Sequence, residues 1–552
     1  MPDHLCTPGW WSGAVGYELY VRSFADGNAD GLGDLIGARE HLEHLAWLGV
    51  DAVWLTPFYP SPGRDAGYDI SDHCAVDPAL GTLEDFDRLL ARARELGLRV
   101  LIDIVPNHTS SEHPWFRSAL EGPDSPHRDY YVWREPKDGG APPNNWVANF
   151  GGPAWTRDPA GRQHYLHLFL PEQPDLNWEL PAVDAEFRRI LRFWRDRGVD
   201  GFRIDVAHML RKDPALRDNP PARRTTREPG TVEAWDRFEH VHDLDQDGVL
   251  DIYRGWRTAV PDALLLGEVY LLDPVRTTRY VQDGDGLDLT FWFGPMVADW
   301  SAASLRRALR EPDALASGRI AWVAGNHDGA RPASRLGGGP RGRRRSLCLF
   351  TLLALLPGMA FLYQGDELGL QDGVVEPADA RDPIAVHGRE PAAGRDGART
   401  PIPWRTGHGW GFTTAPRPWL PYGQHTERDT VAWQREHPDS WLHRHRRLLE
   451  VRRQLRRDGA HGVPQWLAGH EDLVAYRRDD VLVAANLGSE PATVPPAYSA
   501  WQVRFSSLGR DAGSHDGVVA IDEALVLERG RGRGGTSSAG TFEADVVSRA
   551  GQ

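Results

Sequence analysis

The chain has 552 residues, 41% of them hydrophobic and 26% charged, and its formal net charge is -15. This length predicts two or three structural units, and the acidic balance argues against nucleic acid or an anionic membrane as the main partner. The three cysteines, Cys6, Cys74 and Cys348, are too few and too far apart for a disulfide framework or a metal cluster, and they fit a reducing, cytoplasmic compartment.

Short apolar runs alternate with longer helical patterns from residue 15 to about residue 400. We predict buried strands at Val15 to Tyr20, Ala52 to Leu55, Val100 to Val105, Gly201 to Val206, Leu264 to Val269, Leu289 to Phe293, Trp322 to Ala324 and Ala360 to Tyr363. Helical stretches such as Leu83 to Leu96 and Phe187 to Arg197 lie between them, and each is followed by a glycine. Strands alternating with helices in this way predict an α/β fold, a parallel (β/α)8 TIM barrel.

The sequence gives no sign of a targeting or membrane-spanning segment. The N-terminus lacks a basic region followed by an apolar one. The most apolar run, Leu347 to Tyr363, is split by Pro357 and Gly358 into pieces shorter than the about 20 residues of a membrane span. We expect a buried helix followed by a buried strand here, and no membrane partner.

Two connections are too long for simple barrel loops, and the pattern changes near the C-terminus. Residues 107–173 follow the third predicted strand, and residues 371–404 follow the eighth. Short alternating strands are predicted at Leu473 to Tyr476, Val481 to Ala485, Trp501 to Phe505 and Val518 to Ile521. We therefore predict a barrel from residues 1–106 and 174–458, an inserted domain at 107–173, a C-terminal antiparallel β-sandwich domain at 459–529, and a disordered tail at 530–552.

Acidic side chains end several of the predicted barrel strands. Asp103 lies near the end of the third strand, Asp205 ends the fourth, Glu268 the fifth and Asp328 the seventh. Barrel enzymes place their chemistry at this end of the strands. An unpartnered acid at an apolar barrel mouth is costly, so several acids that converge on one rim indicate a catalytic site.

Glycoside hydrolysis requires a set of carboxyl groups of this kind. In a retaining enzyme one carboxylate attacks the anomeric carbon, and a second carboxyl group, roughly 5–5.5 Å away, protonates the leaving oxygen. Adjacent strands can supply such a pair as Asp205 and Glu268. Arg203 would keep Asp205 ionised, and Asp328 would stabilise the positive charge that develops on the sugar.

Four sequence blocks stand in a fixed order on these strands: DIVPNH (103–108), GFRIDVAH (201–208), GEVY (267–270) and GNHD (325–328). With them, over about residues 15–405, the chain resembles glycoside hydrolase family 13, the α-amylase superfamily. The resemblance implies that Asp205 is the nucleophile, Glu268 the acid/base and Asp328 the transition-state stabiliser. It also implies glucose-binding roles for the residues at the matching positions beside them, Arg203, His108 and His327.

Three further blocks resemble the oligo-1,6-glucosidase and α-glucosidase branch of that family: QPDLN (173–177), DAGYD (65–69) and RDGARTPIPW (395–404). By this resemblance Asp65 binds hydroxyls of the terminal glucose, Tyr68 stacks on its ring and Arg399 closes the end of the pocket. A blind pocket implies exo action on short substrates. Val206 favours α-1,6 bonds by the family rule, but the following Ala207 and His208 depart from that group and leave the linkage open.

Oxygen-bearing side chains alternate along a glycine-rich segment near the first strand. Asp26, Asn28, Asp30, Leu32 and Asp34 stand at alternate positions, an arrangement that suits a structural Ca2+, or Mg2+ with more retained water. The alternative is an acidic turn without metal, but the segment resembles the strand-one metal loop of the same branch. We read the similar segment from Asp243 to Gly248 as a solvated loop, and we expect no organic cofactor.

The leading hypothesis is exo-acting hydrolysis of α-linked glucose from disaccharides, short oligosaccharides or α-glucosides, through a covalent glucosyl-aspartate intermediate. A transglucosylase or a trehalose-forming isomerase uses the same three carboxylates, so these residues do not distinguish transfer from hydrolysis. A non-catalytic barrel, like the transporter heavy chains that resemble this family, is disfavoured because all three carboxylates are present. Oligomeric state stays open.

Overall fold

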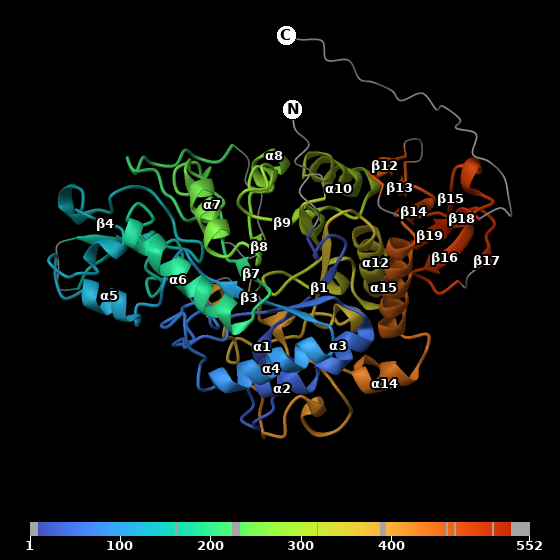
Figure 1. The fold of residues 1–552 in the computed structure, drawn as a ribbon, viewed down its shortest axis with the longest axis horizontal. Coiled ribbons are helices and arrows are strands. Elements are labelled where there is room, and N and C mark those ends of the chain that lie inside the picture. The colour runs from blue at the N-terminus through green and yellow to red at the C-terminus, as the bar shows by residue number, and fades with distance from the viewer. Residues whose placement is uncertain are drawn as a thin grey trace, which may run out of the picture.

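The computed structural model describes residues 9–159, 163–223, 232–316, 318–386, 394–459, 462–467, 471–510 and 513–530 (Figure 1). Its centre is a closed barrel of eight parallel strands. These are β1 (Val15–Leu19), β2 (Ala52–Leu55), β3 (Arg99–Ile104), β7 (Gly201–Ile204), β8 (Leu264–Gly267), β9 (Leu289–Trp292), β10 (Ile320–Val323) and β11 (Met359–Tyr363). The TIM barrel predicted from the sequence is confirmed. The predicted disordered tail falls, from residue 531 onward, outside the described residues.

The strands follow one another around the barrel in chain order, which fixes where the acidic residues leave it. In the parallel ladder between β7 and β8, Ile204 is the partner of Gly267. Asp205 and Glu268 are the next residues on the two strands, so they leave the barrel side by side at its carboxyl end. The ladder between β3 and β7 pairs Asp103 with Arg203.

Apolar side chains fill both faces of the barrel sheet. Inside the barrel Trp54, Leu101, Leu266, Phe291 and Phe361 belong to one buried cluster. A larger cluster lies between the outer face of the strands and the helices. Burial on both faces explains why these strands read as continuous apolar runs rather than alternating ones.

Several of the helices that flank the barrel begin at a capping residue or a proline. The flanking helices are α1 (Val21–Phe24), α2 (Leu35–Glu40), α3 (Leu42–Leu48), α4 (Leu83–Glu95), α6 (Pro181–Arg197), α7 (Val249–Ala259), α8 (Pro274–Thr278), α9 (Gly294–Val297), α10 (Ala302–Ala316), α11 (Pro332–Arg335), α12 (Gly339–Ala354), α13 (Pro383–Val386), α14 (Val431–Glu436) and α15 (Trp441–Arg457). Thr82 and Asp85 form a capping box at the start of α4. The second predicted helix starts earlier than Phe187, at Pro181, because proline suits the first helical position.

The apolar run that begins at Leu347 forms the end of α12 and then β11, as predicted. Ten residues of α12 and all of β11 are buried in the protein. No helix among the described residues combines the length and apolar character needed to cross a membrane.

The connection from β3 to α6 carries a small domain of its own, at the left of Figure 1. It contains α5 (Pro114–Ala119) and a three-stranded sheet in the order β4 (Trp133–Arg134), β6 (His164–Leu166), β5 (Trp155–Arg157). The bridge between His108 and Asp175 joins its two ends. This segment therefore projects from the barrel rim beside the ends of β3 and β7.

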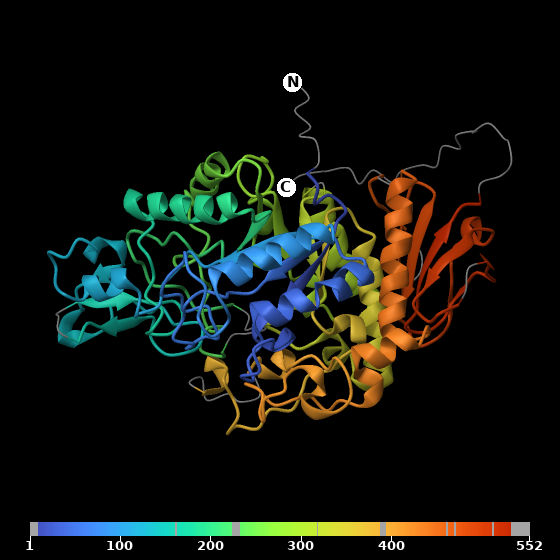
Figure 2. The ribbon, with the colours of Figure 1, turned by 60° about the horizontal axis from the view of Figure 1, so that its bottom comes forward.

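The C-terminal domain packs against α10, α12 and α15 on one side of the barrel (Figure 2). Its larger sheet has the order β12 (Gln465–Trp466), β13 (Leu473–Arg478), β14 (Val481–Asn486), β19 (Ala524–Glu528), β16 (Gln502–Ser506) and β17 (Gly513–Ser514). In a second, two-stranded sheet β15 (Ala492–Thr493) pairs with β18 (Val518–Val519). The antiparallel domain is confirmed. Our strand prediction missed β19, which lies centrally between β14 and β16 and whose first four residues are apolar.

Candidate active site

One buried guanidinium holds the two carboxylates that the sequence assigns to the chemistry. Nη1 of Arg203 lies 2.6 Å from Oδ1 of Asp205, and its Nη2 lies 2.7 Å from Oε2 of Glu268. Nη1 also contacts Oδ1 of Asp103 at 2.7 Å. Arg203 is 1% exposed, so its orientation is fixed by these contacts. Asp205 and Glu268 are thus brought onto the two terminal nitrogens of a single side chain.

The backbone turns sharply after Asp205. Val206 has a φ of 37°, in the left-handed region that a β-branched residue rarely adopts. Its amide donates a hydrogen bond of 3.0 Å to Oε2 of Glu268. The strained backbone at Val206 therefore lies next to Asp205, and the hydrogen bond to Glu268 stabilises it. Backbone strain of this kind is common at functional sites.

The electrostatics around Asp205 differ from our expectation. Burial raises the pKa of Asp205 well above its usual value, and Arg203 lowers it by a smaller amount. Asp103 and Glu268 share the same guanidinium and add to the rise. Arg203 therefore does not by itself keep Asp205 ionised, because one positive charge faces three carboxyl groups.

Asp328 shows the opposite balance. Burial acts to raise its pKa, but His327 together with Arg395 and Arg399 lowers it below the usual value. Oδ1 of Asp328 lies 2.9 Å from Arg395 and 2.8 Å from Arg399. Asp328 is therefore a stably ionised carboxylate, which suits the stabilisation of positive charge.

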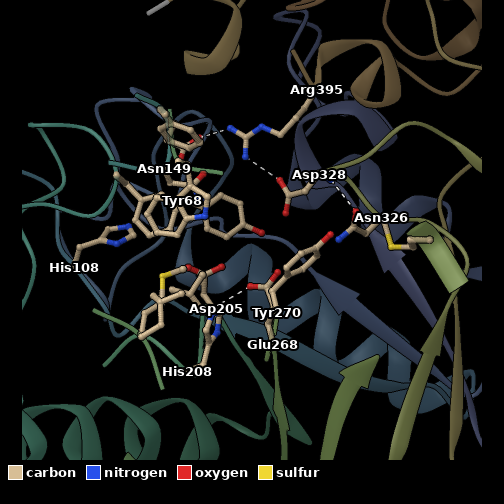
Figure 3. Close-up of a pocket in the computed structure, with 18 residues that line it drawn as sticks. Tyr68, His108, Asn149, Asp205, His208, Glu268, Tyr270, Asn326, Asp328 and Arg395 are labelled. Carbon is tan, nitrogen blue, oxygen red and sulfur yellow. Dashed lines mark hydrogen bonds and ion pairs between the residues drawn. The ribbon is translucent and has the colours of Figure 1, made fainter. Parts of the chain in front are cut away.

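The predicted site residues meet around one pocket (Figure 3). Asp65, Tyr68, His108, Asp205, Glu268 and Asp328 line it. Figure 3 shows Asp328 across the hollow from Asp205 and Glu268, with Arg395 reaching down onto Asp328. Four of the lining carboxylates thus surround a space that opens at the carboxyl end of the barrel.

Arg203, His327 and Arg399 lie behind the pocket wall rather than in it. Nε2 of His327 is 2.8 Å from the hydroxyl of Tyr68, and its Nδ1 contacts Glu18. Arg399 donates to Asp328 and to the carbonyl of His327. Arg399 was expected to close the end of the pocket; the lining side chain is instead Arg395, four residues earlier.

Arg395 was missed, although it is the first residue of the block that contains Arg399. Its Nη2 lies 2.8 Å from Oδ1 of Asp65 and 2.8 Å from Oδ1 of Asp382. The available signal was its place in the same block; in the structure Arg395 directly precedes the 3-10 helix η5 (Asp396–Arg399) that carries Arg399. In the structure both reach Asp328.

A third long connection, from β7 to α7, was also missed. It supplies Val206, His208, Met209, Trp235 and Leu244 to the pocket. The distance in sequence between the fourth and fifth strands was the signal for it. Other lining residues that we did not predict are Asn149, Phe150, Phe169, Tyr270, Met296 and Asn326.

The segment from Asp243 to Gly248 belongs to this connection and is not the solvated loop that we predicted. Asp243 is fully buried. The carboxylate of Asp245 is 3% exposed and forms ion pairs with Arg276 and Arg279, both at 2.8 Å. The backbone amide of Asp245 donates to the carbonyl of His208. These contacts therefore hold the connection between β7 and α7 in place.

The alternating oxygen donors near β1 form a compact loop away from the pocket. Oδ1 of Asp26 accepts the amides of Asn28 and Ala29, and Oδ1 of Asp30 accepts the amide of Leu32. Asp34 is buried, and it caps α2 by accepting the amide of Gly37. No group of three or more His, Cys, Asp or Glu side chains that could hold a metal ion occurs in the described part of the chain. The carboxylate, amide and carbonyl oxygens of the loop are nevertheless the donors that Ca2+ and Mg2+ prefer.

Comparisons with known proteins agree with this geometry. The family model described as "Alpha amylase, catalytic domain" matches residues 18–458, and a domain of unknown function, DUF3459, matches residues 445–527. A probable alpha-glucosidase of Rhizobium meliloti (strain 1021) is 40% identical over 501 residues, covering 88% of this chain and 90% of the relative. A trehalose-6-phosphate hydrolase of Escherichia coli (strain K12) is 36% identical, covering 88% and 92%. The solved structure of an alpha-glucosyl transfer enzyme superposes with a TM-score of 0.86 at 37% identity, covering 95% of this chain and all of the other.

Proposed function

Because this chain belongs to the α-amylase family of glycoside hydrolases, we propose that it is a retaining α-glucosidase acting on small, neutral α-glucosides. The observation that carries the proposal is the shared guanidinium of Arg203, which holds Asp205 and Glu268 together below a third, ionised carboxylate. Two carboxyl groups that share one guanidinium fit the short spacing of a retaining enzyme, roughly 5–5.5 Å, better than the wider spacing that an inverting enzyme needs for its water.

In the first step Glu268 donates a proton to the glycosidic oxygen while Asp205 attacks the anomeric carbon. Positive charge develops on the glucose ring, and the ionised Asp328 stabilises it. In the second step Glu268 removes a proton from water, which attacks the anomeric carbon and releases Asp205. The net result is glucose with its α configuration retained.

The closed end of the pocket supports exo action on one terminal glucose. Asp65 on the β2 side and Arg395 on the β11 side form an ion pair of 2.8 Å across it. Gln173 from the inserted segment adds a hydrogen bond of 3.2 Å to Asp65. This barrier would block a longer chain from extending past the non-reducing end.

The charges of the pocket favour neutral substrates over phosphorylated ones. Among its described lining residues Asp65, Asp205, Glu268 and Asp328 face a single cation, Arg395. Arg395 already contacts three carboxylates, so its positive charge is more than balanced before any phosphate could approach. The hydrolysis of a sugar phosphate, the activity named for one relative, is therefore not the activity that we propose.

The proposal is tested by following the products of hydrolysis of isomaltose and maltose. We expect glucose to appear first as the α anomer by proton NMR, with no rapid fall in viscosity when starch is the substrate. Initial release of β-glucose would contradict the retaining mechanism, and rapid thinning of starch would contradict exo action.

Transfer of glucose to another alcohol is the second candidate. The attacking water and an acceptor alcohol compete for the same glucosyl-enzyme, and a structurally similar protein is an alpha-glucosyl transfer enzyme. New glucosides among the products, quantified against free glucose, measure the share of transfer.

We also propose that the loop from Asp26 to Asp34 binds a structural Ca2+ or Mg2+. The side chains of Asp26, Asn28, Asp30 and Asp34 and the carbonyl of Leu32 would hold the ion. Oδ2 of Asp26 already accepts hydrogen bonds from the amide of Gly31 and from Thr413. These bonds already join the loop to the segment around residue 413, and the ion would hold the oxygens of the loop together without entering the reaction.

A further inference from the structure

The two ends of the pocket differ in chemistry. Asp65, Asp328 and Arg395 make one end charged. Val206, Met209, Trp235 and Leu244 also line the pocket and belong to one apolar cluster, and of these Val206 directly contacts Glu268. All four come from the connection between β7 and α7, so a single segment shapes this part of the pocket.

This apolar wall begins at the acid/base carboxylate. The amide of Val206 donates to Oε2 of Glu268, and Glu268 must face the glycosidic oxygen to protonate it. The group attached to that oxygen, or the alcohol that later replaces it, is therefore next to Val206. The charged end, beyond Asp328, is left for the hydroxyls of the glucose.

Among the described lining residues, this part of the pocket has few polar side chains besides the catalytic carboxylates. They are His208, Tyr270 and Asn326, and Oδ1 of Asn326 already accepts the amide of Asp328. Burial lowers the pKa of His208 to about 4, so this ring is neutral at neutral pH. A second sugar carries several hydroxyls that lose their water on binding, and each needs a partner to avoid a desolvation cost.

Among the described residues, the cations closest to the catalytic carboxylates already pair with carboxyl groups of the protein. Nζ of Lys212 lies 2.8 Å from Asp175 and 2.7 Å from Asn107. Arg203 is surrounded by three carboxyl groups. The wall therefore offers apolar and aromatic faces and no free positive charge among the described lining residues.

We propose that this wall, made of Val206, Met209, Trp235 and Leu244, is a site for an apolar aglycone or acceptor alcohol, aryl or alkyl, in preference to a second sugar. The inference rests on the proposed function, because the acceptor must attack glucosyl-Asp205. In that step the acceptor oxygen forms a bond to the anomeric carbon and gives its proton to Glu268. The bond from the anomeric carbon to Asp205 breaks, and Asp205 leaves as a carboxylate.

The test uses α-glucosyl fluoride as the donor, since fluoride is too small to contact the wall. Benzyl alcohol and glucose are offered together at equal concentration, and benzyl α-glucoside and disaccharide are quantified. Burial of an aromatic ring against the apolar wall is favourable, so we expect benzyl transfer to exceed transfer to glucose by about tenfold or more. Equal or faster transfer to glucose overturns the proposal, and so does hydrolysis without any benzyl α-glucoside.

Substitutions in the wall make the test specific. Leu244→Asn and Met209→Gln place an amide on the wall, and each is expected to lower the ratio of benzyl to glucose transfer about fivefold. Leu315→Asn is the matched control, because Leu315 lies on the outer helix α10 and is 37% exposed; the ratio should stay unchanged. Unchanged ratios in folded wall variants overturn the proposal, and Met209→Gln decides the matter if Leu244→Asn does not fold. A failure of the native enzyme to release fluoride contradicts the proposed function itself.

Discussion

Nη1 of Arg395 lies 2.9 Å from Oδ1 of Asp328, the carboxylate that we assign to transition-state stabilisation. The same guanidinium contacts Asp65 and Asp382. One side chain from the connection after β11 therefore links the carboxylate at the closed end of the pocket to the carboxylate that faces the reacting bond. Substrate binding and transition-state stabilisation are coupled through this residue.

Arg395→Lys should lower kcat/KM for maltose and isomaltose by about 100-fold, because a lysine ammonium cannot reproduce the forked contacts of the guanidinium. Arg405→Lys is the matched control, since Arg405 is exposed on the same connection, and it should behave like the native enzyme. Steady-state kinetics measure both variants. A change of less than threefold in the Arg395 variant would show that the bridge to Asp65 and Asp328 does not matter.

Glu268→Gln should separate substrates by their leaving groups. The amide cannot protonate a glycosidic oxygen, so turnover of maltose should fall by about 100-fold or more. Formation of the glucosyl-enzyme from α-glucosyl fluoride needs no such proton and should be far less affected. Burst kinetics of fluoride release measure that step alone. An equal loss with both donors would contradict the acid role of Glu268.

Asp205→Asn should stabilise the folded protein at neutral pH while abolishing turnover. Burial raises the pKa of Asp205 in the folded state, whereas the unfolded value is about 3.9. Ionisation is then harder in the folded state, so stability falls as the pH rises above the unfolded value. The neutral amide avoids this cost, and its gain in Tm at pH 7 should shrink as the pH approaches 4. Calorimetry at both pH values measures it; a lower Tm at pH 7 would contradict the assignment.

Asp328→Asn should have the opposite effect on stability. The pKa of Asp328 is lowered by His327, Arg395 and Arg399 against the effect of burial. Its contribution to stability is therefore present above the unfolded value of about 3.9 and is lost as the pH falls through the folded pKa. The variant should melt below the native protein at pH 7, and the difference should narrow in acid. Parallel calorimetry with Asp205→Asn makes the two signs directly comparable.

The barrel strands and the acidic residues at their ends could be predicted from the sequence, because the burial of each strand determines its pattern of apolar residues. Both faces of each barrel strand are buried, so the strands appear as apolar runs, and the acids at their ends stand out. Strand β19 was missed because its apolar run lies beyond an irregular stretch and has no alternation. Asp205 and Glu268 could be paired because neighbouring parallel strands bring their carboxyl ends together.

The side chains contributed by long connections could not be predicted in the same way. Trp235 and Leu244 line the pocket because of the path that the β7 to α7 connection takes. Asp245 holds this connection in place through its ion pairs with Arg276 and Arg279. No short pattern in the sequence encodes such a path. The choice between Arg395 and Arg399 likewise depended on the direction of one helical turn, which residue spacing alone leaves undetermined.

The metal proposal for the loop from Asp26 to Asp34 makes the last prediction. Binding of an ion to the folded state alone raises its stability by about 2.7 kcal/mol at a hundredfold excess over Kd. After treatment with a chelator, addition of Ca2+ or Mg2+ should therefore raise the Tm of the native protein by several degrees.

Asp30→Asn removes one exposed carboxylate of the loop and should abolish most of that rise. Asp124→Asn, at an exposed position in the inserted segment, is the control and should retain it. Because Tm is the readout, the result does not depend on activity. A native protein whose Tm is unchanged by both ions would mean that the loop is held by its own hydrogen bonds, such as those from the amides of Asn28 and Ala29 to Asp26, and needs no metal.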